Sequence, residues 1–209
     1  MRSIYLLLLF CVICITCYAQ TNHLPKKSLR FNIGESTHGT GDLKGISFGT
    51  AYTHYLKKKL SLEYHFKGTI HDDQDTYLLF VNGNLEQDGS VRTTTAGFQL
   101  GSLIRYSPLR TLNHEFTIAA GPYGRYESSS LGSNGYAARY PSPASPIPRI
   151  LIEFDHSFAQ RIYNIGYMAE LSYSYTFKKR LFLGMNIAFQ NDTNGDAITH
   201  LGFLVGKRF

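Results

Sequence analysis

Apolar and polar residues alternate with a period of two along eight segments of this 209-residue chain. Successive side chains of a β-strand point to opposite faces, so each segment is predicted to be a strand with one apolar and one polar face. Tyr163–Phe177 keeps the alternation over its whole length, which no helix would do. The eight predicted strands are Leu29–Gly34, Ile46–Leu56, Leu60–Ile70, Thr94–Tyr106, Glu115–Tyr126, Tyr163–Phe177, Leu181–Gln190 and Thr199–Phe209.

The composition agrees with an all-β fold. Hydrophobic residues make up 43% of the chain and charged residues only 17%, which argues against a disordered polymer. Nineteen glycines and fifteen tyrosines favour short strands joined by turns over a helical bundle. We therefore expect one folded domain, and we predict that the apolar strand faces, with side chains such as Phe66, Phe98, Leu171 and Phe203, contact lipid.

The first nineteen residues resemble an export signal. Arg2 is followed by the apolar run Ile4–Ile15 and by Cys17-Tyr18-Ala19, which predicts a signal peptide cleaved after Ala19 and a barrel domain over residues 20–209. A membrane anchor is the alternative, but the run is shorter than a bilayer span; lipid modification of Cys17 is another. All three cysteines lie in this segment, so the mature chain would contain no disulfide and no thiolate metal site.

The connections between the predicted strands differ in length, as they do in outer-membrane barrels with short periplasmic turns and longer outer loops. Eight strands also place both termini on the periplasmic side. We predict an eight-stranded antiparallel transmembrane β-barrel. The alternative is ten strands, if Tyr77–Val81 and the turn signal Asn82-Gly83 add a pair. The short links are 57–59, 107–113 and 178–180, and the longer ones 35–45, 71–90 and 127–160.

The polar strand faces would line a filled interior, since eight strands enclose little more than side chains. Glycines on this face, such as Gly97, Gly101 and Gly202, would relieve crowding. Glu63, Arg105 and Glu115 are expected to form salt bridges towards the periplasmic end. A plug of satisfied charges is the favoured interpretation, and a proton or ion path the alternative. The predicted interior charges are Arg30, Glu63, Lys67, Arg105, Glu115, Arg125 and Glu170.

The predicted signal peptide, the eight strands and the ending His200–Phe209 resemble the small OmpA/OmpX-like outer-membrane β-barrels. In that family the last strand ends in an aromatic residue that the barrel assembly machinery recognises, so the resemblance implies that Phe209 is a sorting signal. His200, Gly202 and Val205 match the rest of the motif, whereas Lys207 stands where a second apolar residue is usual.

Lipid A deacylases are barrels of this size that use a His-x-Ser pair and a later Glu. Asp155-His156-Ser157 with Glu170 resembles that set, but His156 and Ser157 are adjacent and would point to opposite faces of a strand. The apolar residues of 147–158 instead follow a helical period, which predicts a short amphipathic helix in an outer loop. We therefore predict neither an enzyme nor a cofactor.

The ligand spacing and the charge distribution favour neither a metal ion nor a nucleic acid as a ligand. The run His71–Asp75 could gather a divalent cation, but it lacks the ligand spacing and glycine of a calcium loop, so we predict a solvated acidic loop and no metal. The formal charge, +6 for the chain and +5 without Arg2, is not clustered on a helix, so we expect no nucleic-acid partner.

The sequence thus predicts a monomeric barrel in a Gram-negative outer membrane, in contact with lipid and lipopolysaccharide, with a structural or surface-interaction role. Its outer loops would contact an extracellular ligand that the sequence does not identify. The alternatives are a lipid A-modifying enzyme, a narrow channel or small-ligand transporter, and a soluble exported β-sandwich.

Overall fold

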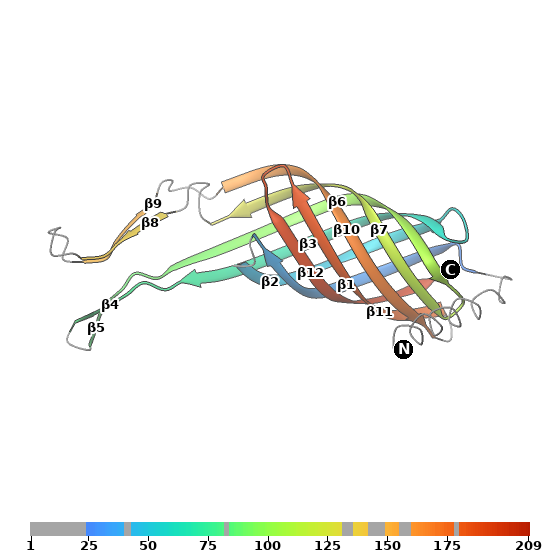
Figure 1. Ribbon diagram of the computed structural model, residues 1–209, viewed down its shortest axis with the longest axis horizontal. Helices are drawn as coiled ribbons and strands as arrows, with labels where there is room; N and C mark the ends of the chain where they lie inside the picture. The colour runs from blue at the N-terminus through green and yellow to red at the C-terminus, as the bar shows by residue number, and fades with distance from the viewer. Residues whose placement is uncertain are drawn as a thin grey trace, which may run out of the picture.

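The computed structural model describes residues 24–39, 43–81, 84–130, 136–141, 149–154, 160–177 and 180–209. Eight antiparallel strands close into a barrel in which each strand pairs with its sequence neighbour among the eight, and the first pairs with the last (Figure 1). The barrel strands are β1 (Lys27–His38), β2 (Leu43–Tyr55), β3 (Leu60–Asp75), β6 (Val91–Arg110), β7 (His114–Ser129), β10 (Gln160–Thr176), β11 (Leu181–Asp192) and β12 (Ala197–Arg208).

The barrel closes between β1 and β12, whose ladder runs from Ser28 opposite Arg208 to His38 opposite Ile198. At one end the Lys27 amide donates to the Phe209 carbonyl at 2.9 Å. We call this the near end and the opposite one the far end. A closed ladder satisfies the backbone groups of every strand, which a β-structure in lipid requires.

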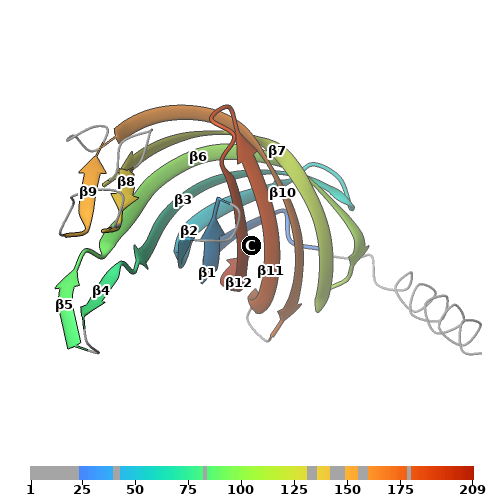
Figure 2. The same ribbon diagram turned by 60° about the vertical axis from the view of Figure 1, so that its left-hand side comes forward.

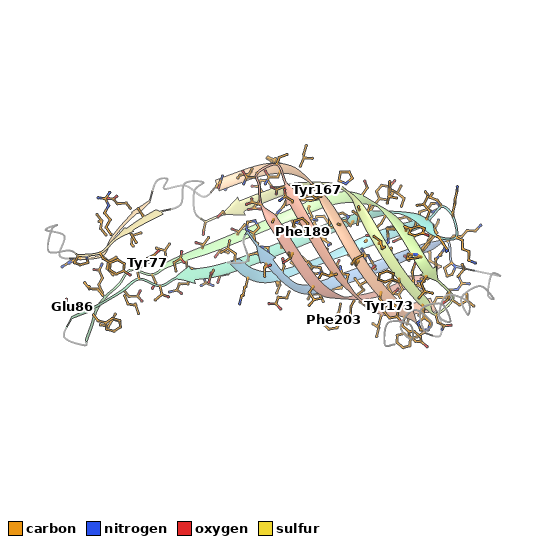
Figure 3. All side chains as sticks on the ribbon, viewed as in Figure 1. Tyr77, Glu86, Tyr167, Tyr173, Phe189 and Phe203 are labelled. Carbon is orange, nitrogen blue, oxygen red and sulfur yellow. The ribbon has the colours of Figure 1, made fainter. Side chains whose placement is uncertain are left out.

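The side chains are sorted as the alternation predicts. The outward face carries large apolar residues, among them Tyr167, Tyr173, Phe189 and Phe203 (Figure 3), and Phe203 is 65% exposed. The inward residues between them are buried and mostly polar, as in β10, where Glu170 is buried between exposed neighbours. Apolar groups outside and polar groups inside are the reverse of a soluble core, so the alternative of a soluble sandwich is wrong.

The barrel wall is higher on one side than on the other. β1, β11 and β12 each have 12 residues, about what a tilted strand needs to cross a bilayer. β6 has 20 residues, and β3, β7 and β10 have 16, 16 and 17. These four neighbouring strands therefore continue past the others at the far end.

Two hairpins lie beyond the high side of the wall (Figure 2). β4 (Leu78–Val81) pairs with β5 (Asn84–Asp88), and β8 (Tyr136–Arg139) pairs with β9 (Leu151–Phe154). Each pair forms its own two-stranded sheet and joins no barrel strand. The ten-stranded alternative is therefore wrong, and the hairpin signal at Asn82-Gly83 belongs to a hairpin outside the barrel.

The structure corrects two local predictions. The described part of the predicted amphipathic helix contains β9, because a short apolar run can complete a hairpin as readily as it can form a helical turn. His71–Asp75 is the end of β3 and not a loop, because the ladder with β6 continues to Asp75 opposite Val91. The predicted signal peptide and residues 142–148 lie outside the described residues. Among those described, no helix has the length and apolarity to span a membrane.

Candidate functional site: the polar interior

The barrel interior holds a central network of two arginines and two glutamates. Arg30 Nη2 lies 2.6 Å from Glu63 Oε1 and 2.8 Å from Glu170 Oε1. Arg105 pairs with Glu63 and lies 3.5 Å from Glu170 Oε1. All four side chains are buried, and Glu63 and Glu170 have no exposed side-chain surface. The four charges balance, as buried ions must if they are to remain ionised.

Neutral groups add hydrogen bonds to the two carboxylates. The Thr53 hydroxyl donates to Glu63 at 3.0 Å, and the Asn186 amide donates to Glu170 at 3.0 Å. Arg105 also donates to the Ser172 hydroxyl at 3.2 Å. The network therefore contains residues from six strands, namely β1, β2, β3, β6, β10 and β11. Because some of these strands are on opposite sides of the barrel, the network crosses the interior.

Glu115 lies in a second network nearer the chain termini. It accepts from Arg208 at 2.8 Å, from the Tyr55 hydroxyl at 2.9 Å and from the Ser107 hydroxyl at 2.8 Å. Arg110 Nε lies 3.6 Å from Glu115 Oε1. The sequence predicted salt bridges between Glu115, Glu63 and Arg105. In the structure the ion-pair partners of Glu115 are instead Arg110 and Arg208, which were not among the predicted interior charges.

Lys67 and a small apolar cluster occupy the middle of the barrel. The Lys67 ammonium lies 3.6 Å from the sulfur of Met168, which is fully buried. His65 fills the space above Gly101, where an added Cβ would lie 2.5 Å from its ring. This glycine makes room for an interior side chain, as the sequence predicts. The apolar cluster consists of Leu103, Ala119, Tyr123, Met168 and Ala188.

Arg125 belongs to a third group of charges, at the far end. Its Nη2 lies 2.7 Å from Glu127 Oε2 and donates to the Thr69 hydroxyl at 3.2 Å. The seven predicted interior charges are all buried, but they do not form one cluster: four form the central network, Lys67 lies against Met168, Glu115 lies nearer the chain termini and Arg125 lies at the far end.

The residues that resemble a deacylase are not assembled in the described structure. Asp155-His156-Ser157 lie outside the described residues, and the carboxylate of Glu170 is engaged by Arg30 and Asn186. The side chains of His71–Asp75, for which a bound cation was the less favoured interpretation, also point to different surroundings. Asp72 accepts a bidentate pair of hydrogen bonds from Arg92, from Nε to Oδ1 and from Nη2 to Oδ2, and His71 is buried on the inward face.

The comparisons with known proteins concern the fold. Neither a protein-family model nor a curated protein matches this chain. Among solved structures, Ail of Yersinia pestis in complex with the heparin analogue sucrose octasulfate aligns over 90% of this chain and 100% of its own, with 8% identity and a TM-score of 0.54. Neisserial surface protein A aligns over 88% and 97%, with 12% identity and a TM-score of 0.55.

Identities this low carry information about the fold alone. Together with the apolar outer face, the fold supports the outer-membrane location that the sequence predicts. By architecture, the chain is a small eight-stranded β-barrel of the outer-membrane kind.

Proposed function

We propose that this protein is an outer-membrane barrel with a plugged interior whose role is to bind a protein partner at the cell surface. The near end, with the termini and short turns, would face the periplasm. The far end, with its two hairpins, would face outwards. The observation that carries the proposal is a structured projection, defined here as β4, β5, β8, β9 and the strand ends that bear them (Figure 2).

Specific contacts join the two hairpins of the projection. The Gln87 side chain donates to the Ile150 carbonyl at 3.0 Å and accepts from the Ile150 amide at 2.8 Å. The rings of Tyr77 and Tyr140 lie 6.2 Å apart. Two segments distant in sequence are thereby held as one surface. Loops held on a rigid scaffold are where proteins commonly place recognition sites.

The surface chemistry of the projection favours a protein ligand. Phe80, Leu85 and Tyr140 are exposed there although they lie outside the barrel, and exposed apolar and aromatic groups are typical of the centre of a protein interface. Acidic Glu86 and basic Arg149 line the same hollow. Among the described residues of the projection, acidic and basic side chains are mixed, as in the ion pair of Arg139 with Glu153, and this mixture does not favour a polyanion such as the heparin analogue bound by Ail.

The projection is tested by trimming it. Residues 77–89 are replaced by a two-residue Asn-Gly turn, which joins the ends of β3 and β6 and leaves the barrel intact. Cells with the trimmed or full chain are compared for adhesion to immobilised extracellular-matrix proteins and to other bacterial cells. We expect adhesion to fall to the level of cells without the gene, while heat-modifiable gel migration is retained. Equal adhesion of trimmed and full-length cells on every surface would refute the proposal.

The central network and the apolar cluster support the plugged interior, because both consist of buried side chains inside the barrel. We expect no discrete conductance steps when the purified barrel is added to a planar bilayer. Arg105→Ala, which removes one side chain from the plug, is the matched variant. Steps with the unaltered chain that widen in Arg105→Ala would favour a narrow channel instead.

We further propose that the chain is not an enzyme. Glu170, the one deacylase-like residue that the structure describes, is held by Arg30 and serves charge balance. Mass analysis of lipid A from cells with and without the gene is expected to give identical acyl chains. Loss of an acyl chain that depends on Glu170 would overturn this.

Phe209 is proposed as the signal read by the barrel assembly machinery. Its carbonyl accepts from the Lys26 and Lys27 amides, while its ring is exposed. Phe209→Ser should therefore reduce the amount of barrel in the outer membrane without changing the stability of the protein refolded in detergent. A matched change at Phe203, which lies within β12, should instead change stability.

A further inference from the structure

The third group of charges, at the far mouth of the barrel, contains a set of titratable residues that lies outside the central network and the Glu115 network. It consists of His38 at the end of β1, Glu127 in β7 and Asp196 in the turn that follows β11. His38 Nε2 lies 3.6 Å from Glu127 Oε1 and 3.9 Å from Asp196 Oδ2. β1 and β7 are on opposite walls, so the three residues meet across the mouth.

The imidazole of His38 is buried, with 6% of the residue exposed, yet no described residue forms a hydrogen bond with its Nε2. A buried nitrogen between two carboxylates has lost its hydration and gained no close partner, which is costly. His71 lies beside it with ring centroids 5.3 Å apart, and its Nδ1 is likewise without a hydrogen bond in the described chain.

The two carboxylates are oriented by neighbouring side chains. Arg125 lies 2.7 Å from Glu127 Oε2, which leaves Oε1 towards His38. The turn that carries Asp196 is held by Asp192, whose carboxylate accepts a hydrogen bond from the Asp196 amide at 3.3 Å. The Asn194 side chain donates to Asp196 Oδ2 at 3.0 Å. Hydrogen-bonded partners that fix donor atoms in this way are typical of metal sites.

We propose that His38, Glu127 and Asp196 bind a divalent transition-metal ion, with Zn²⁺ as the best match. One imidazole and two carboxylates are ligands that Zn²⁺ accepts. With metal–ligand bonds of about 2.0–2.2 Å, donor atoms around a tetrahedral ion are about 3.3–3.6 Å apart. The observed 3.6 and 3.9 Å are too long for hydrogen bonds, and all three donor atoms lie within 4.8 Å of one another, so the three side chains would have to move inwards to bind the ion.

Charge balance supports the same ion. Glu127, Asp196 and the neighbouring buried Asp192 contribute three negative charges, and Arg125 offsets one of them. A divalent cation would compensate the remaining two, whereas the competing arrangement, an imidazolium between two carboxylates, would compensate one. Asp196 keeps 24% of its side chain exposed, so water can complete the coordination from the cell-surface side. Bound metal would connect the two walls and the β11–β12 turn.

The experiment uses the full mature barrel, folded in detergent and freed of metal with EDTA. Zn²⁺ is titrated at pH 7.5 by calorimetry, and Co²⁺ uptake is followed by its visible absorption. His38→Gln and Asp196→Asn remove ligands. The matched controls are His114→Gln and Asp73→Asn, which alter an exposed histidine at the near end and an exposed aspartate of β3. Heat-modifiable gel migration reports whether each variant is folded.

We expect the unaltered chain to bind one Zn²⁺. The affinity should be at least tenfold weaker in each ligand variant and unchanged in the two controls. The nitrogen resonances of the His38 ring should shift when Zn²⁺ is added to the unaltered chain, which tests the site even if a variant does not fold. The proposal is overturned if binding is not saturable, if both ligand variants bind like the unaltered chain, or if His38 is found protonated and insensitive to Zn²⁺.

Discussion

Replacing Glu63 by glutamine should destabilise the barrel by about 3–5 kcal/mol, the usual cost of leaving a buried charge without its partner. Glu63 has no exposed surface and binds Arg30, Arg105 and the Thr53 hydroxyl. Without its charge the two arginines share Glu170 alone, at 2.8 and 3.5 Å. The lower limit corresponds to roughly a hundredfold change in the unfolding equilibrium.

A double-mutant cycle separates this loss of charge balance from loss of packing. Arg105→Gln alone leaves an excess negative charge, whereas Glu63→Gln with Arg105→Gln removes one charge of each sign. The double variant should therefore cost less than the sum of the singles, by about 0.5–3 kcal/mol. Urea unfolding in lipid vesicles, followed by tyrosine fluorescence because the chain has no tryptophan, gives the free energies.

Glu86→Gln, at an exposed position on the projection, serves as the control and should change stability by less than about 0.5 kcal/mol. Mutual charge balance in the central network is refuted if Glu63→Gln costs less than about 1 kcal/mol, or if the double variant costs the full sum of the two single variants. Either result would mean that water or a shifted proton compensates the arginines, and that the network is not held by mutual charge.

Three other changes test other parts of the structure. Phe203→Arg places a cation in lipid and should cost about 2–4 kcal/mol in vesicle unfolding, whereas Phe203→Tyr should cost far less. Gly101→Val should lower the unfolding temperature, since its Cβ would lie 2.5 Å from the His65 ring; unchanged stability would show that His65 is free to move. Hydrogen bonds from Arg92 hold the pKa of Asp72 below its ordinary 3.8, so their contribution persists above pH 3.8 and is lost as the pH falls through the lowered pKa. In a carboxyl NMR titration Arg92→Gln should raise that pKa, and an unchanged value would contradict the pairing.

The period-two alternation was sufficient to predict which side chains face outwards. Lipid and the barrel interior impose opposite preferences on successive residues, so the pattern is repeated in every strand and is readable without any knowledge of pairing. Phe31 is exposed and Arg30 buried, for instance, and the same holds for Phe66 and Lys67.

Partners across the interior could not be predicted in this way, because they depend on strand order and register. Glu115 and Arg208 are 93 residues apart and meet only after the barrel closes. Arg110 was not identified as an interior residue for a different reason. The β6–β7 register shifts between Tyr106 and Leu109, so the alternation that marks Arg105 as inward does not extend to Arg110.

The far-mouth residues lie beyond the predicted ends of their strands. The prediction for β1 ended at Gly34 because the residues from Glu35 to Thr37 are all polar and show no alternation. The structure extends this strand to His38 and extends β7 past Tyr126 to include Glu127. A strand end held by its neighbours needs no apolar face, so sequence periodicity stops short of it.

Because the barrel wall is higher on one side than on the other, the molecule is asymmetric within the plane of the membrane. β3, β6, β7 and β10 form a tall side, whereas the shorter β1, β2, β11 and β12 form a low side. Two copies that met along their low sides would point their projections away from each other. In a crowded bilayer, this asymmetry would determine in which direction within the membrane plane the projection reaches a neighbouring cell or molecule.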